Sequence, residues 1–154
     1  MRSCKVLQAL AGRRLATAES LTGGGIGHAI TAVSGASAVY AGGIISYTNE
    51  VKHRLLGVPT ELLDTLGAVS GPVAQAMAEG ARRATGADVA VSVTGLAGPG
   101  GDEFGHSVGT VVIGYADDRA AFSREYHFDG DREAVRDQTI DAALELILER
   151  NPIE

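Results

Sequence analysis

Ser20 stands where a short apolar run ends and a glycine-rich stretch begins. The run over residues 15–18 is predicted to be a buried strand, and the glycines at residues 23–25 are typical of a helix start. At such a junction α/β proteins expose a nucleophilic serine beside backbone N–H groups. The same pattern also fits a serine that caps a helix on a glycine-rich turn. Ser20 is therefore a candidate nucleophile that this stretch alone does not establish.

Tyr47 and Lys52 lie at a second predicted junction, where a strand runs into a helix. Lys5 and Lys52 are the only lysines in a chain that otherwise uses arginine. A desolvated lysine can lose its proton, whereas an arginine cannot. Serine, tyrosine and lysine together can carry out acyl transfer without histidine, with neutral lysine or tyrosinate taking the serine proton. The alternative is an exposed lysine at a helix start beside a half-buried tyrosine.

A third apolar run, residues 89–94, leads into a glycine-rich loop over residues 95–101. Such a loop at the carboxyl end of a strand suits close approach of the backbone to an anionic ligand. It is not a phosphate-binding Walker loop, because no Gly-Lys-Ser or Gly-Lys-Thr follows. It is not a dinucleotide fingerprint either, because residues 108–115 are predicted to be a strand rather than a helix. The alternative is a plain flexible loop.

The elements that would position these residues alternate along the chain. Helices are predicted over residues 3–13, 24–33, 50–56, 59–66 and 132–149 and from residue 70 onward, and strands over residues 15–19, 41–47, 88–94, 108–115 and 120–128. Thr60 is expected to cap the helix over residues 59–66. The last two strands form a hairpin and are therefore antiparallel, while the strand–helix–strand units favour parallel pairing. The sequence thus predicts an α/β fold: a single three-layer α/β/α domain over residues 1–154, with a mixed, partly parallel sheet covered by helices.

Composition narrows the class of protein. A chain of 154 residues can bury a core without metals or disulfides, and Cys4 has no partner for an internal disulfide. No cysteine and histidine cluster has zinc spacing, so no metal site is expected. The net charge of −6 disfavours a general nucleic-acid binder. The sequence contains neither a membrane-spanning run nor a signal-peptide core, so we expect a cytoplasmic protein that does not bind membranes.

Several spaced motifs resemble, in order, the CinA carboxy-terminal domain family, whose enzymatic members are nicotinamide mononucleotide amidases. The matching segments are residues 18–24, 47–52, 55–58, 67–70, 94–99, 108–111 and 130–132. The resemblance runs from about Leu15 to the helix after Arg132, and several motifs in the right order are more specific than any one of them. The family commonly has a cysteine after the serine, where this chain has Leu21. Because that position supplies no obvious catalytic group, we expect only a packing change.

The resemblance implies hydrolysis of the carboxamide of nicotinamide mononucleotide to nicotinate mononucleotide and ammonia. Ser20 would be the nucleophile and Lys52 the general base, with Tyr47 relaying the proton or orienting the pair. A turn at a helix start offers backbone N–H groups that can stabilise an oxyanion. The residues expected to do so are Thr22, Gly23 and Gly24.

The substrate's phosphate needs cationic or N–H partners. Arg132 and Arg136 lie one turn apart at the start of the last predicted helix, where they are candidates for this role. Their alternative is a solvated helix face. Thr94 and Gly95 are candidate contacts between the glycine loop and the substrate. Neither a metal nor an organic cofactor is implied.

The competing hypothesis is a non-catalytic module, either a nucleotide-binding or a competence- and damage-related one. The presence of Ser20, Tyr47 and Lys52 argues against it, because a retired active site would be free to lose any of them. An amidase acting on another pyridine or purine nucleotide is a third possibility. The resemblance also implies a homo-oligomer, and a form of the family without the amino-terminal domain that precedes this one in some relatives.

Overall fold

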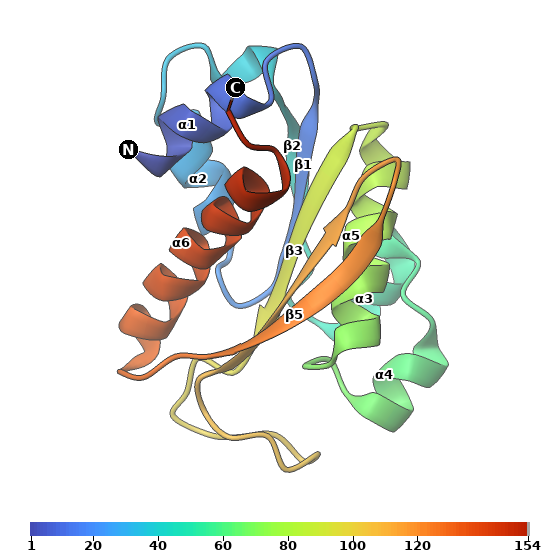
Figure 1. Ribbon diagram of the computed structural model, residues 1–154. Helices are drawn as coiled ribbons and strands as arrows, with labels where there is room; N and C mark the ends of the chain where they lie inside the picture. The colour runs from blue at the N-terminus through green and yellow to red at the C-terminus, as the bar shows by residue number, and fades with distance from the viewer. Residues whose placement is uncertain (154) are drawn as a thin grey trace.

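A five-stranded sheet lies between two layers of helices in the computed structural model, which describes residues 1–153 (Figure 1). The order of strands across the sheet is β2-β1-β3-β4-β5. The strands are β1 (Leu15–Glu19), β2 (Tyr40–Ile45), β3 (Val89–Gly95), β4 (Thr110–Ala116) and β5 (Ala121–His127). β1 pairs in parallel with both β2 and β3, whereas β3, β4 and β5 pair antiparallel. The predicted α/β fold with a mixed sheet is confirmed.

Helices cover both faces of the sheet (Figure 1). One face carries α1 (Arg2–Ala9), α2 (Gly25–Thr31) and α6 (Arg132–Arg150), and the other carries α3 (Asn49–Leu56), α4 (Thr60–Leu66) and α5 (Gly71–Thr85). A short 3-10 helix, η1 (Ala36–Ala38), precedes β2. The short strand β1, which lies between β2 and β3, is buried along its whole length because both helical layers cover it.

Most predicted element boundaries differ from the structure by a few residues, and three of these differences concern the following positions. The helix predicted over residues 3–13 ends at Ala9, and the backbone then turns at Gly12, which has a φ of +83°. The predicted cap Thr60 is instead the first residue of α4, and Pro59 occupies the cap position without a side-chain hydrogen bond. β2 ends at Ile45, so Tyr47 lies beyond the strand.

The two faces of the sheet are packed with different side chains. On the face under α1, α2 and α6, aliphatic residues such as Val91 and Ile113 of the sheet belong to the same core cluster as Ile147 of α6. The face under α3 and α5 is lined by small residues, including Ala16 and Ala18 of β1 and Ala90 of β3. Small side chains let the helices on this face approach the sheet closely.

Gly80 of α5 allows α3 to pack tightly in this layer. A Cβ on Gly80 would collide with the backbone carbonyl of Leu56, the last residue of α3. α3 then ends at Gly57, whose φ of +68° is the left-handed conformation common after a helix. This packing holds α3, and with it Lys52, against the carboxyl ends of the parallel strands.

Candidate active site

The three parallel strands end side by side in hydroxyl-bearing residues. The ladders that join β1 to β2 and to β3 both reach Glu19. One residue further, the same register aligns Ser20 with Ser46 on one side and with Thr94 on the other. All three side chains are buried. The carboxyl ends of parallel strands are where open α/β sheets place their ligands.

Lys52 reaches this row from α3. Its Nζ lies 3.1 Å from Ser20 Oγ, and it donates hydrogen bonds to the carbonyl oxygens of Ser46 at 2.8 Å and Tyr47 at 3.2 Å. Thr48 caps the start of α3, with its hydroxyl accepting a hydrogen bond from the backbone N–H of Val51 at 3.3 Å. The structure therefore brings together Ser20 and Lys52, which lie 32 residues apart in the sequence.

Lys52 is 1% exposed, and its burial lowers the pKa of the ammonium group to about 8. Within residues 1–153 no carboxylate forms an ion pair with Lys52 that would restore the charge. With a pKa of about 8, roughly a tenth of the lysines are neutral at pH 7. A fraction of this size is enough for a general base, whose most effective pKa lies near the working pH.

The partners of the Lys52 nitrogen determine where its lone pair points. An ammonium group can donate to all three oxygens around it. A neutral amine has two N–H bonds, and the carbonyls of Ser46 and Tyr47 can only accept. The remaining direction, toward Ser20 Oγ, is then left for the lone pair. The same three contacts thus suit both the charged lysine and a neutral lysine that accepts the Ser20 proton.

Glu19, which the sequence pattern did not single out, lies directly before Ser20 and is held by a set of hydrogen bonds. Its carboxylate is 2% exposed and accepts hydrogen bonds from the hydroxyls of Thr17 at 3.1 Å and Thr22 at 2.7 Å. It also accepts from the backbone N–H groups of Ile26 at 2.8 Å and Gly27 at 3.0 Å, at the start of α2. These bonds join the end of β1 to the turn and helix that follow, so Glu19 fixes the backbone on both sides of Ser20. An acidic residue that ends a buried strand directly before a candidate nucleophile was the available signal.

The turn after Ser20 uses positive φ angles at Gly23 (+60°) and Gly24 (+102°). The N–H of Gly23, expected to stabilise an oxyanion, donates to the Ser20 carbonyl oxygen at 3.1 Å. Thr22, the third residue expected there, is held by Glu19 through its hydroxyl. The residue of this turn that lines the central cavity is Leu21. Its backbone N–H has no hydrogen-bond partner within residues 1–153.

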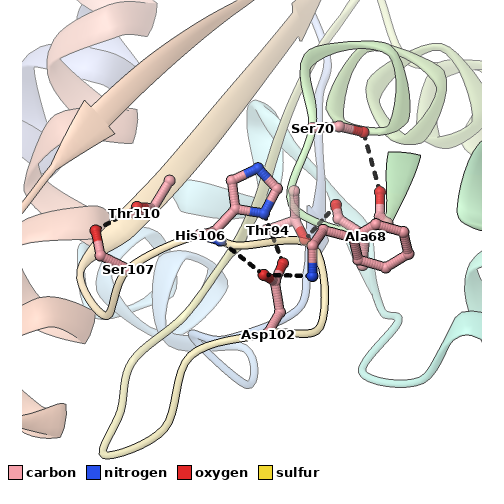
Figure 2. Close-up of polar contacts among 9 residues, drawn as sticks. Ala68, Ser70, Thr94, Asp102, His106, Ser107 and Thr110 are labelled. Atoms are coloured by element: carbon pink, nitrogen blue, oxygen red, sulfur yellow. Dashed lines mark hydrogen bonds and ion pairs between the residues drawn. The ribbon is translucent and has the colours of Figure 1, made fainter. Parts of the chain in front are cut away.

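A cavity of about 430 Å³ opens in front of Ser20 and Lys52. It is lined from the strand ends, from α3, from the segment before α5 and from the loop between β3 and β4. Thr94 and Gly95, predicted as substrate contacts, both line it. The Thr94 hydroxyl donates to the Ala68 carbonyl oxygen at 3.0 Å, which joins the end of β3 to the segment before α5 (Figure 2).

Tyr47 lines the cavity, but its hydroxyl forms no hydrogen bond with Ser20 or Lys52 within residues 1–153. The side chain is 60% exposed, and its hydroxyl accepts from Arg132 at 3.3 Å. Tyr47 contacts Lys52 through its backbone carbonyl oxygen instead. The contact of Tyr47 with the Ser20–Lys52 pair is therefore through its backbone, and the predicted role of Tyr47 in relaying the proton or orienting the pair stays a prediction.

The two arginines predicted to bind phosphate occupy different environments. Arg132 lines the cavity and donates to the Gly98 carbonyl oxygen at 2.7 Å. Arg136 lies outside the cavity lining and donates to the carbonyl oxygens of Leu21 at 2.9 Å and Thr22 at 3.3 Å. Arg132 is therefore placed to meet a ligand, whereas Arg136 holds the turn that follows Ser20.

The part of the chain that the structure describes contains no group of three histidine, cysteine, aspartate or glutamate residues able to hold a metal ion. None of its helices is both long and apolar enough to cross a bilayer.

The fold and the site together define an α/β protein with a buried serine–lysine pair at the carboxyl end of a parallel strand. Residues 3–151 match the family model described as the CinA C-terminal domain. The chain belongs to this family, as the motifs in its sequence predicted.

Relatives and solved structures agree with this assignment. The chain is 50% identical over 136 residues to the nicotinamide-nucleotide amidohydrolase PncC of Pseudomonas putida, covering 88% of this chain and 85% of that protein. It is 49% identical over 139 residues to a CinA-like protein of Geobacter sulfurreducens, but spans only 34% of that relative's length. The competence/damage inducible protein CihA from Agrobacterium tumefaciens superposes with a TM-score of 0.93 at 38% identity, covering 97% of this chain and 93% of that one.

Proposed function

We propose that this protein is an amidohydrolase that converts nicotinamide mononucleotide to nicotinate mononucleotide and ammonia. The observation that carries the proposal is the 3.1 Å contact between Ser20 Oγ and the nitrogen of a buried lysine whose pKa is about 8. The similarity to the Pseudomonas putida nicotinamide-nucleotide amidohydrolase supports the substrate.

The reaction follows from the partners of Lys52. Neutral Lys52 takes the proton of Ser20 while Oγ attacks the carboxamide carbon, so one C–O bond forms and the carbonyl π electrons move to oxygen. Collapse of the tetrahedral intermediate breaks the C–N bond, and Lys52 returns the proton to the leaving nitrogen, which departs as ammonia. Neutral Lys52 then takes a proton from water as the water oxygen attacks the ester carbon. The C–Oγ bond breaks, Lys52 returns the proton to Ser20 Oγ, and the product leaves as its carboxylate after losing a proton to solvent.

Two binding roles follow from the geometry of the cavity. The N–H of Leu21, which is next to the nucleophile in the chain and has no other partner within residues 1–153, would donate to the oxyanion. Arg132 would bind the phosphate, because it is the arginine that lines the cavity. Thr94 and Gly95 would contact the substrate, and Glu19 and Arg136 would position the turn that carries Ser20. The homo-oligomeric state and the cytoplasmic location expected from the sequence stay predictions.

Ammonia release from nicotinamide mononucleotide by the purified protein tests the proposal. We expect turnover with one ammonia formed per nicotinate mononucleotide. The control is Ser20→Ala protein prepared in the same way, which should bind the nucleotide without turning it over. Binding by the wild-type chain without ammonia release would instead establish a non-catalytic nucleotide-binding module.

A further inference from the structure

The loop between β3 and β4, residues 96–109, forms one wall of the cavity and has no part in the proposed chemistry. It contributes Asp102, Glu103 and Phe104 to the cavity lining. Phe104 is 38% exposed, although it is a large apolar residue. An aromatic side chain that faces an open cavity is available to a ligand.

Asp102 gives this loop a defined shape. One carboxylate oxygen accepts from the backbone N–H groups of Phe104 at 3.1 Å and His106 at 2.9 Å, and the other lies 2.6 Å from His106 Nδ1. Partial burial works against ionisation of Asp102, but the hydrogen bonds from His106 and Phe104 outweigh it and lower the pKa of the carboxyl group. Figure 2 shows the Asp102–His106 pair beside Thr94 and Ala68. The carboxylate therefore organises the backbone that presents Phe104.

A chain of contacts places Phe104 on the β3 side of the nucleophile. Thr94 lies next to Ser20 in the register of the sheet and holds the Ala68 carbonyl oxygen. The adjoining Gly67 packs on the Phe104 ring so closely that a Cβ there would lie 2.5 Å from the ring. Lys52 approaches Ser20 from the opposite side, next to β2.

The cavity lining carries charges of both signs. Asp102 and Glu103 provide carboxylates beside Phe104, and Glu103 has no hydrogen bond or ion pair within residues 1–153. Arg132, at the start of α6, provides a cation that donates to the Gly98 carbonyl oxygen at 2.7 Å and to the Tyr47 hydroxyl at 3.3 Å. Nicotinamide mononucleotide is also divided in charge. Its pyridinium ring, which carries the reacting carboxamide, is positive, whereas its phosphate is negative.

We propose that the Asp102–Glu103–Phe104 segment is the specificity wall for a positively charged aromatic ring, with the face of Phe104 and the carboxylate of Glu103 as its contacts. This inference rests on the proposed function, because it assigns a binding role within the same cavity. A cation above an aromatic face is stabilised by the ring quadrupole, and more so when it is shielded from water. The wall would favour an oxidised pyridinium nucleotide over its reduced form, in which the ring is neutral and not aromatic.

Dissociation constants measured by calorimetry test this preference without turnover. Ser20→Ala protein is titrated with nicotinamide mononucleotide and with dihydronicotinamide mononucleotide, which has the same ribose, phosphate and carboxamide. We expect the oxidised nucleotide to bind roughly tenfold more tightly. Adding Phe104→Ala or Phe104→Leu should reduce this ratio to about one to three, whereas Phe104→Trp should keep it. Glu103→Gln should lower the ratio about threefold, and Glu125→Gln on the exposed part of β5 is the charge-matched control.

The proposal is overturned if Phe104→Leu keeps the full preference, since bulk alone would then explain it. The proposal is also overturned if both Phe104→Ala and Glu103→Gln leave the ratio of the two dissociation constants unchanged. Turnover by the wild-type chain, measured separately, decides the proposed function. A protein that releases no ammonia but shows the predicted binding ratios would contradict the amidase proposal and support the wall.

Discussion

The Ser20–Lys52 centre and the loop over residues 96–109 share one cavity but are built in opposite ways. Lys52 is 1% exposed and is held by carbonyl groups at strand ends, whereas Phe104 is 38% exposed on a loop shaped by the Asp102 carboxylate. Chemistry that depends on a proton transfer over about 3 Å requires a rigid frame, and the sheet supplies it. Ligand recognition tolerates a loop, and a loop can change without disturbing the frame.

Burial has a different consequence in each region. In the centre it removes water from Lys52 and lowers the pKa to about 8, so that about a tenth of the side chains are neutral at pH 7 and able to accept a proton. In the loop the Asp102 carboxylate is occupied by Phe104 and His106, whereas the Glu103 side chain is exposed. Substitutions in the centre should therefore affect kcat, and those at the cavity wall should affect KM. Four predictions test this division, in order of decreasing effect.

Ser20→Ala should lower kcat on the order of 10⁴-fold while leaving the fold intact, because the nucleophile is removed and only binding and oxyanion contacts remain. Steady-state ammonia release and circular dichroism measure the two effects. Ser46→Ala is the matched control, since Ser46 occupies the same row but contacts Lys52 through its carbonyl oxygen alone. Near-normal turnover by Ser20→Ala would rule out the serine mechanism.

Lys52→Arg should lower kcat by about 10³-fold, because an arginine keeps the charge but cannot accept the Ser20 proton. In the wild-type protein the base must be neutral, so kcat/KM should rise about tenfold per pH unit below pH 8 and level off above it. The exposed Lys5→Arg is the control for the change in residue type. A pH profile that is flat between pH 6 and pH 9 would contradict the role of Lys52 as the base.

Glu19→Gln should lower kcat roughly tenfold to a hundredfold and destabilise the fold by about 1–3 kcal/mol, because an amide cannot accept all four of the hydrogen bonds around this carboxylate. Nucleotide binding should change little, since Glu19 lies outside the cavity lining. Thermal unfolding and steady-state kinetics measure these effects, with the exposed Glu50→Gln as control. A rise in KM at constant kcat would mean that Glu19 acts on binding rather than on the position of Ser20.

Arg132→Ala and Arg136→Ala compare the cavity wall with the catalytic centre, because both arginines lie in α6 but only Arg132 lines the cavity. Removing Arg132 should raise KM for nicotinamide mononucleotide roughly tenfold. It should also reduce the enzyme's preference for this substrate over nicotinamide riboside, which lacks the phosphate, measured as the ratio of the two kcat/KM values. Removing Arg136 should lower kcat a few-fold without changing that preference, because it holds the Leu21 and Thr22 carbonyls. Each variant is the control for the other, and equal loss of preference in both would place both arginines on the phosphate.

Much of the fold could be predicted because its signals are local. The glycines after Ser20, the glycine after α3 and the proline in the first turn of α5 each reflect a backbone requirement that a single position reveals. The end of α1 could not be predicted in the same way, because the apolar pattern continues past Ala9 while the backbone turns at Gly12.

The sequence by itself determined the order of the elements, the mixed sheet and the candidacy of Ser20 and Lys52, because strand ends, glycine turns and a rare lysine are visible along the chain. Only the tertiary structure decided what these residues touch. It placed the Tyr47 backbone carbonyl against Lys52 and the Tyr47 hydroxyl beside Arg132. It directed Arg136 to the Leu21 and Thr22 carbonyls and made Glu19 the anchor of the turn after Ser20. Hydrogen bonds between residues distant in the sequence depend on how strands and helices pack, and no local pattern records that packing.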